Sequence, residues 1–336
     1  MQTSLPVGKL SPRYLAQLFE RYTFPDERVL LGPGIGHDAA VISFGDRYLV
    51  AKTDPITFAT DEIGWYAVHV NANDVACTGA TPRWFMATLL LPEGRADRSM
   101  VDTIFDQIAG ACTALDVALI GGHTEVTTGF DRPVIVGCML GEVALDRLVR
   151  ADGARPGDVL VVTKGVAVEG TAIIAREIGA ALQDLGADFL ARCRDFLYTP
   201  GISVVRDAAV ATAAGRVHAM HDPTEGGLAS GLWEMAEAAG VGLVVDEAAL
   251  PVLPETDVLC RRLGVNPLGL IASGSLLMAL PPTAVDAVCT ALREAGISAT
   301  EIGVVVEREA GIVLRGPDGD RELPYFTQDE IVKALG

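Results

Sequence analysis

The sequence has few aromatic residues, few basic residues and no long unbroken hydrophobic run. Aromatic residues make up 6% of the 336 residues, and 26 Lys and Arg stand against 44 Asp and Glu, which gives a formal net charge of −18. An acidic chain without a basic cluster repels phosphate backbones and anionic membrane surfaces, so we expect neither nucleic acid nor a membrane as partner. The N-terminal segment lacks the apolar core of a signal peptide, which predicts a cytoplasmic location.

Cysteine is also sparse and unpatterned. No two of the six cysteines form a CxxC pair, and most lie among apolar residues, as buried free thiols do. The six are Cys77, Cys112, Cys138, Cys193, Cys260 and Cys289. This spacing predicts neither a disulfide framework nor a metal–thiolate site. The longest uncharged stretch, residues 263–285, is interrupted by three prolines and reads as a loop plus a buried strand.

Length and turn signals indicate two domains. A chain of 336 residues exceeds one domain of roughly 150 residues, and the clearest break is the Pro156-Gly157-Asp158 turn before an apolar strand. We therefore place a boundary near residue 152 and expect domains at 1–152 and 153–336.

Strand and helix signals alternate on both sides of this boundary. The predicted elements are, in order, a helix that begins at Ser11-Pro12, a hairpin, helices over about 61–78 and 99–115, two strands, helices over about 170–179 and 203–214, a helix that begins at Asp222, and a closing helix–strand pair.

The first candidate site segment is GHDAAVISFGDRYLVAKTD, which predicts two strands around a Gly-Asp turn. If Ser43 pairs with Tyr48, the antiparallel ladder brings Asp38 and Asp54 to the same open end of the hairpin. Two adjacent carboxylates repel one another unless a cation or a proton lies between them. A divalent metal ion would satisfy both, whereas solvated turn residues are the alternative.

The second segment is the helix EIGWYAVHVNANDVACTGATP. Asp74 is its only charged residue between Ile63 and Pro82, so the helix is expected to be buried or interfacial. Asn71, Asp74 and Thr78 recur at spacings of three and four and form one polar stripe. A buried carboxylate needs a partner, and the stripe is either a hydrogen-bond network or the source of a third metal ligand.

The third segment, ALIGGHTEVTTG, predicts an apolar strand that runs into a Gly121-Gly122 turn and then displays His123, Thr124 and Glu125. Glycines at such a turn let backbone N–H groups approach an anion, and Glu125 could add a carboxylate to a metal cluster. A glycine pair alone is a weak signal, and no further histidine nearby completes a transition-metal site.

The fourth segment is HDPTEGGLASGLWEMAEAAG. Asp222 followed by Pro223 and Glu225 is a complete helix-start signature that requires no function. Gly226-Gly227 in the first turn costs about 1 kcal/mol per glycine, which favours the close approach of a phosphate or of a second backbone.

The usual nucleotide fingerprints are absent: the chain has no GxxxxGK[ST], GxGxxG or GxSxG motif. Several acidic residues together with Gly-rich turns and Lys52 favour Mg²⁺-nucleotide binding, in which the ion bridges protein carboxylates and phosphate oxygens.

In this order, the motifs GHDAAV, TDPITF, VNANDVACTGATP, IGGHTEV, ARPGD, DPTEGG and IASGSLL resemble the superfamily of aminoimidazole ribonucleotide (AIR) synthetase, thiamine-monophosphate kinase, selenophosphate synthetase and the hydrogenase-maturation dehydratase HypE. The likeness spans residues 32–280, and the DPTEGG and ASGSLL segments are most similar to HypE. The resemblance implies a two-domain PurM-like fold, with an N-terminal α+β domain that dimerises through its mixed sheet and a C-terminal α/β domain.

The resemblance also implies ATP and Mg²⁺ as cofactors and phosphoryl transfer to an amide, carbamoyl or similar oxygen. On matching positions, Asp38, Asp54 and Asp74 would bind Mg²⁺. The nucleotide would lie near Lys52, Thr53, Asn71, Gly121, Gly122, His123 and Thr124, with Asp222, Gly226 and Gly227 facing it from the second domain. No catalytic residue and no acceptor, whether a small molecule or a protein-borne group, is implied for this chain.

Two departures qualify the resemblance. His123 stands where relatives often have Asp, so a metal role there passes to Glu125 or is lost. The final residues, QDEIVKALG, lack the cysteine on which HypE carries its carbamoyl group, so we expect an acceptor other than the protein's own tail. A small-molecule kinase and a non-catalytic nucleotide-binding partner of maturation proteins are the alternatives.

Overall fold

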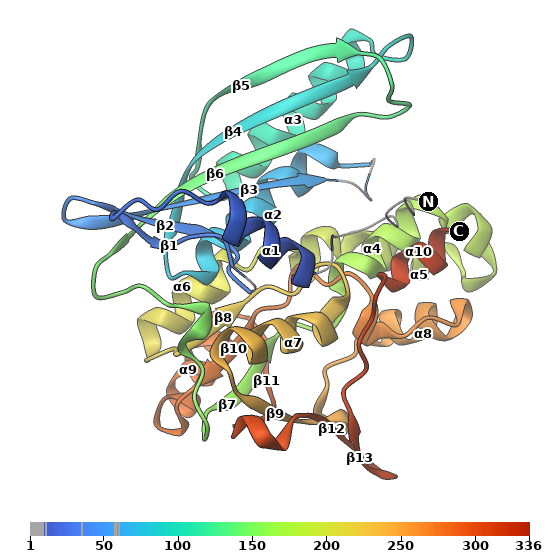
Figure 1. The fold of residues 1–336 in the computed structure, drawn as a ribbon. Helices are drawn as coiled ribbons and strands as arrows, with labels where there is room; N and C mark the ends of the chain where they lie inside the picture. Colours follow the sequence, from blue (N-terminus) through green and yellow to red (C-terminus); the bar gives the residue numbers. More distant parts are fainter. Residues whose placement is uncertain (1–9, 11, 35, 57–58, 60) are drawn as a thin grey trace, which may run out of the picture.

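The computed structural model describes residues 10, 12–34, 36–56, 59 and 61–336, which form two domains, each built around one β-sheet (Figure 1). The predicted boundary at residue 152 falls between the two sheets and stays a prediction. Ser11, the predicted cap of the first helix, lies outside the described residues, and the helix begins at Pro12 as predicted. Within the described part of the chain, no helix is long and apolar enough to span a bilayer.

The N-terminal domain contains a six-stranded sheet in the order β1-β2-β3-β6-β4-β5. Its strands are β1 (Val29–Leu31), β2 (Ala40–Phe44), β3 (Arg47–Ile56), β4 (Thr81–Pro92), β5 (Ala118–Thr127) and β6 (Val134–Ala144), and its helices are α1 (Pro12–Tyr22), α2 (Ile63–Cys77) and α3 (Arg98–Ala114). All neighbouring strands pair antiparallel except β4 and β5, which pair parallel.

Helices α2 and α3 of the same domain cover one face of this sheet. Residues of β6 alternate between buried and half-buried, which is the pattern of a sheet with one packed face. The buried set, including Ile135 and Met139, faces α2, and α3 packs on α2 and β5. The half-buried set, including Val136 and Leu140, lies on the opposite face, which we call the open face. The open face is the feature of the fold that a second copy of the chain could cover.

The C-terminal domain contains a seven-stranded sheet in the order β13-β12-β9-β11-β7-β10-β8. Its strands are β7 (Val159–Thr163), β8 (Ala219–His221), β9 (Gly242–Asp246), β10 (Leu277–Leu280), β11 (Ala299–Val306), β12 (Ile312–Gly316) and β13 (Gly319–Glu322). Its helices are α4 (Val168–Glu177), α5 (Ala187–Asp195), α6 (Val205–Ala214), α7 (Gly227–Ala239), α8 (Pro254–Leu263), α9 (Pro282–Glu294) and α10 (Glu330–Leu335).

Helices cover both faces of this second sheet. In β7, Leu160 and Val162 join a core that includes α4 and α7, whereas the intervening Val161 joins a smaller core with α6 and α9. The larger core continues into the N-terminal domain, where it includes Val68 of α2 and Phe85 of β4. The two domains therefore share a continuous apolar core.

Helix α2 lies between the two domains and is buried on all sides, since every residue except Trp65 is buried. Asn73, fully buried, connects the domains directly: its amide nitrogen donates to the carbonyl of Ile202 at 2.8 Å, and its oxygen accepts from the N–H of Val204 at 2.8 Å. These bonds fix α2, and with it the polar side chains of its stripe, relative to the C-terminal domain.

Most of the predicted elements are confirmed. The hairpin has the predicted register, with Ser43 opposite Tyr48, and the helices predicted at 61–78, 99–115 and 203–214 correspond to α2, α3 and α6. The 263–285 stretch contains β10, whose four residues are all buried, as predicted. The prediction omitted β4, because its apolar residues do not alternate with polar ones.

Candidate functional site

The hairpin of β2 and β3 directs Lys52 and Asp54 toward α2. The two residues are two positions apart in a strand, so their side chains lie on the same face of the sheet. The Lys52 ammonium lies 3.2 Å from a carboxylate oxygen of Asp54 and 3.1 Å from one of Asp74 on α2. Burial lowers the pKa of Lys52, but the carboxylates of Asp74, Asp54 and Asp38 outweigh it and raise the pKa above its usual range. Lys52 therefore stays charged and links strand β3 to helix α2.

The three side chains of the polar stripe on α2 make different contacts. Asn71 accepts from the N–H of Asp54 at 2.8 Å and donates to the carbonyls of Asp54 and Ala67, so its amide is bound within the protein. Gly137 gives it room, because a Cβ there would lie 2.3 Å from the amide nitrogen. Thr78 donates to the carbonyl of Val75 at 2.7 Å. Of the three, only Asp74 extends into the carboxylate cluster.

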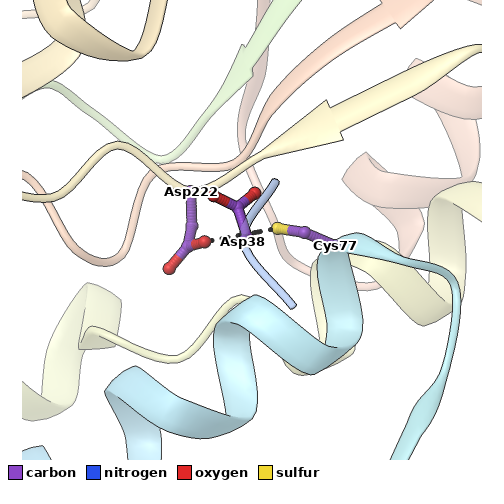
Figure 2. Close-up of side chains that lie close together, drawn as sticks. All are labelled: Asp38, Cys77 and Asp222. Carbon is purple, nitrogen blue, oxygen red and sulfur yellow. Dashed lines mark hydrogen bonds between the residues drawn. The ribbon is translucent and has the colours of Figure 1, made fainter. Parts of the chain in front are cut away.

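Asp38 meets Asp222 of the second domain near Cys77 of α2 (Figure 2). One possible ligand atom from each of the three lies within 4.8 Å of the others, and the Cys77 thiol donates to an Asp222 oxygen at 3.5 Å. Asp222 is 1% exposed, and its second carboxylate oxygen has no hydrogen-bond partner among the described residues. A buried unpaired carboxylate oxygen is costly, so this position fits a ligand that the protein does not itself supply.

His221, next to Asp222 in the chain, links the two domains. Its Nδ1 lies 2.8 Å from Asp38, and its Nε2 lies 2.8 Å from Glu234 of α7. Burial lowers the pKa of His221, but the two carboxylates outweigh it and raise the pKa well above its usual range, so the imidazolium donates to both. Sequence reasoning did not use His221 or Glu234, since nothing in a local pattern pairs residues on β8 and α7.

The cluster contains more carboxyl groups than cationic side chains. Burial raises the pKa of Asp74 well above its usual range, with the neighbouring carboxylates adding to the effect and Lys52 opposing it. Burial and Asp38 raise the pKa of Asp222 to about 7, opposed by His221 and Lys52. Five carboxyl groups, those of Asp38, Asp54, Asp74, Asp222 and Glu234, share the two cations Lys52 and His221, a shortage that a divalent ion with oxygen ligands would remove. Among the described residues, the ligand atoms that lie close enough to share one ion belong to Asp38, Cys77 and Asp222, and the oxygens of the two aspartates fit Mg²⁺.

The prediction of a Gly-Gly turn was wrong. Gly121 and Gly122 lie within β5, an exposed edge strand that continues to Thr127. Gly122 is level with Asp54, but β6 and β4 lie between them, so three inter-strand steps of about 4.8 Å separate the two residues. Two adjacent glycines predict a break in a strand from sequence alone. In the structure, the hydrogen bonds to β4 keep both glycines in the strand.

The other predicted residues of β5 lie on the open face. His123 and Glu125 are an odd number of positions from Gly122, so they point away from α2, and their side chains bond to one another at 3.2 Å. Thr53 is also on the open face, where its hydroxyl donates to the Gly137 carbonyl at 2.8 Å. Thr124 shares the face of Gly122 but lies on the same distant strand. Within one chain these residues do not join the carboxylate cluster.

The prediction that a helix begins at Asp222 was also wrong. Helix α7 begins at Gly227, and both glycines adopt positive φ, 81° at Gly226 and 67° at Gly227. A Cβ on Gly227 would lie 2.4 Å from the carbonyl of Leu268, so the second-backbone alternative is the correct one. The N–H of Gly226 donates to the carboxylate of Asp329 at 2.6 Å, which leaves it unavailable to a phosphate.

Comparison with known proteins matches two family models to this chain. The AIR synthase related protein N-terminal domain matches residues 36–143, and the C-terminal domain of the same family matches residues 155–315. The chain belongs to the AIR synthase related family, and the predicted resemblance and two-domain PurM-like fold are confirmed.

Individual relatives are HypE proteins. Carbamoyl dehydratase HypE of Cupriavidus necator is 34% identical over 295 residues, which cover 81% of this chain and 77% of the relative. The structure of hydrogenase maturation protein HypE in complex with ATP has a TM-score of 0.72 at 28% identity and covers 97% of both chains. A HypE-HypF complex has a TM-score of 0.76 at 22% identity, with 93% of this chain and 99% of that chain covered, a likeness of fold.

The burial of Asp329 predicts a pH-dependent stability. Burial raises the pKa of Asp329 from 3.8 to about 6, opposed by three backbone N–H groups. Between these values the folded protein holds a proton that the unfolded chain releases, so this contribution to stability is present at low pH and lost as the pH rises. Relative to Asp329→Asn, the natural chain should lose on the order of 2 kcal/mol of unfolding free energy between about pH 4 and pH 6.

Urea unfolding of both proteins across this pH range measures the difference. Asp102→Asn, at an exposed position of α3, is the control and should follow the natural chain at every pH. A constant difference between the natural chain and Asp329→Asn across the range would show that Asp329 does not hold its proton in the folded state.

Proposed function

We propose that this protein is a Mg²⁺-dependent, ATP-binding enzyme that transfers phosphate from ATP to an amide, carbamoyl or similar oxygen of an acceptor. The observation that carries the proposal is the unpartnered, buried oxygen of Asp222 in a cluster whose carboxylates outnumber its cations. Such a cluster is suited to a divalent ion and, through the ion, to the phosphates of a nucleotide. The relatives named carbamoyl dehydratase, and the HypE structure in complex with ATP, support this function.

The roles of the chain's own residues follow from their positions. Bound Mg²⁺ would neutralise charge on the phosphates during transfer. Asp54 and Asp74 would hold the ion from the first domain, and Asp222 from the second. Lys52 positions the carboxylates of Asp54 and Asp74, while His221 positions Asp38. The acceptor oxygen bonds to the γ-phosphorus as the bond to the β-phosphate oxygen breaks, and ADP leaves.

The reaction type distinguishes this proposal from its alternatives. A small-molecule kinase would use the same carboxylates and release a phosphorylated product, whereas a dehydratase or ligase would release free phosphate after the acceptor reacts further. A non-catalytic partner in hydrogenase-type maturation would bind ATP and form no ADP. Measurements of ATP binding and of ADP and phosphate release therefore distinguish the three functions.

Calorimetric titration with ATP, with and without Mg²⁺, tests the proposal. Asp54→Asn and Asp74→Asn each remove one carboxyl group that would bind the ion, so ATP affinity in Mg²⁺ should fall at least about tenfold, or 1.4 kcal/mol. Asp106→Asn, on the exposed surface of α3, is the matched control and should bind as the natural chain does. No binding of ATP by the natural chain, or binding that is indifferent to Mg²⁺, would contradict the proposal; ADP formation in the same samples reports turnover.

We further propose that the protein is a homodimer formed through the open face. This face carries half-buried Val136, Leu140 and Met86, and it continues onto the exposed edge strand β5. Apolar surface of this extent on one sheet favours a partner surface. In a dimer, the residues of β5 could approach the carboxylate cluster of the second copy, whereas they lie far from the cluster of their own chain. These residues are Gly121, Gly122, His123, Thr124 and Glu125.

Sedimentation equilibrium measures this directly. The natural chain should sediment as a dimer, and Val136→Lys should shift it toward the monomer because a lysine in the contact would be desolvated. Val258→Lys, at a 40% exposed position of α8, is the control and should remain dimeric. A monomeric natural chain at micromolar concentration would rule the dimer out.

A further inference from the structure

Helix α2 brings a thiol group to the boundary between the two domains. Cys77 is the last residue of α2 and is 3% exposed. It lies next to Asp38, just before β2, and to Asp222, directly after β8 (Figure 2). One possible ligand atom from each of the three residues lies within 4.8 Å of the other two. The Mg²⁺ position proposed above uses Asp222 but does not use the sulfur of Cys77.

The separation of two of these atoms already matches that of two ligands on one metal ion. The Sγ of Cys77 and the Oδ1 of Asp222 are 3.5 Å apart. When a sulfur and a carboxylate oxygen bind a tetrahedral zinc ion at about 2.3 Å and about 2.0 Å, they lie about 3.5 Å from one another. The two side chains can therefore bind one ion at their present separation.

Asp222 has bonding capacity that the protein does not use. Its Oδ1 accepts from the thiol of Cys77, and its Oδ2 has no hydrogen-bond partner among the described residues. The two nearby cations, Lys52 and His221, each contact two other carboxyl groups, and in the described part of the chain neither forms an ion pair with Asp222. A carboxyl group that is 1% exposed and has no ion-pair partner favours a bound cation.

Asp38 is oriented as a third ligand. One of its carboxylate oxygens lies 2.8 Å from Nδ1 of His221, a contact that fixes the group while the other oxygen can coordinate an ion. A cavity of about 10 Å³ adjoins both Asp38 and Cys77. This volume is about the smallest that admits one water molecule, and it excludes a nucleotide. The space beside the three residues therefore suits a single ion.

The thiol decides which class of ion the three residues select. Mg²⁺ and Ca²⁺ take oxygen ligands, whereas Zn²⁺ and similar transition-metal ions also bind thiolate sulfur. Burial, together with the neighbouring acids, raises the pKa of Cys77 well above its usual range, so the thiol keeps its proton in the metal-free protein. An ion that binds the sulfur displaces this proton, which leaves to solvent. A hard ion such as Mg²⁺ gains too little from sulfur to do so.

We propose that Cys77, Asp38 and Asp222 form a second metal site, next to the position proposed for Mg²⁺. Its ion is a divalent cation with affinity for sulfur, of the class of Zn²⁺ and Co²⁺. Water or a phosphate oxygen completes the coordination. The site shares Asp222 with the proposed function but does not rest on it, because neither the three ligand atoms nor the measurement requires a nucleotide.

Titration of the nucleotide-free protein with Co²⁺ tests the site, because a cobalt–thiolate bond gives a charge-transfer absorption band that oxygen ligands do not give. The natural chain should develop this band and reach its maximum at a single equivalent of Co²⁺. Zn²⁺ should then remove the band, whereas about a hundredfold excess of Mg²⁺ over Co²⁺ should not. Absence of the band, or its loss to Mg²⁺ at this excess, would overturn the proposal.

Three variants assign the band to these residues. Cys77→Ser should fold, since a serine hydroxyl can still donate to Asp222, and it should lose the band. Asp222→Asn keeps the thiol but removes a charged ligand, so it should weaken Co²⁺ binding at least about tenfold. Cys289→Ser, at a half-buried position of α9, is the matched control and should behave as the natural chain does. A band that persists in Cys77→Ser would show adventitious binding at another cysteine and would overturn the proposal, as would an unchanged Co²⁺ affinity in Asp222→Asn.

The second metal site and the proposed function can fail separately. A cobalt–thiolate band in a protein that does not bind ATP with Mg²⁺ would contradict the proposed function alone. Mg²⁺-dependent ATP binding by a protein that gives no such band would contradict the second metal site alone.

Discussion

The structure depends on holding like charges together at the boundary between two domains. Four aspartate carboxyl groups converge there with two cationic side chains, and repulsion among the acids would drive them apart if the chain around them were free to move. Three of the acids come from the N-terminal domain and the fourth from the C-terminal domain, so the charge balance of the site is also a constraint on how the domains meet. The cationic partners are Lys52 and His221.

The surrounding fold resists this repulsion by burial and by hydrogen bonds that are not part of the cluster. Helix α2 has no solvent-facing side, and its two asparagines form hydrogen bonds to different domains. Asn71 bonds to strand β3, and Asn73 bonds to the backbone of the second domain. Because the apolar core runs through both domains, a movement of one domain would expose core residues of both. The acids are therefore presented to a ligand in a fixed arrangement, which is what preorganised charge stabilisation requires.

Local patterns in the sequence were sufficient for the parts of the site that lie close together in the chain. The hairpin register followed from strand alternation around a short turn, and it placed Asp38 and Asp54 correctly at one end. The isolation of Asp74 in an uncharged helix indicated a buried carboxylate. The resemblance then added the family and the two-domain fold, which the comparisons confirm.

Contacts between distant segments could not be predicted in this way. His221 bridges Asp38 and Glu234 across 183 and 13 residues, and no periodicity encodes such a pairing. Two predictions were wrong for a related reason. Residues 121–122 form a strand rather than a turn because they pair with β4, and α7 begins later than predicted because Asp329 binds the N–H of Gly226.

The central claim is that the carboxylate cluster needs a divalent ion which both domains hold. Electron paramagnetic resonance of Mn²⁺, as a substitute for Mg²⁺, measures bound and free ion in the presence of a non-hydrolysable ATP analogue. The account predicts that the natural chain removes the free Mn²⁺ signal and that Asp222→Asn, altered only in the second domain, leaves much more ion free. Equal Mn²⁺ binding by the natural chain and Asp222→Asn would show that the ion is held by the first domain alone and would contradict the account.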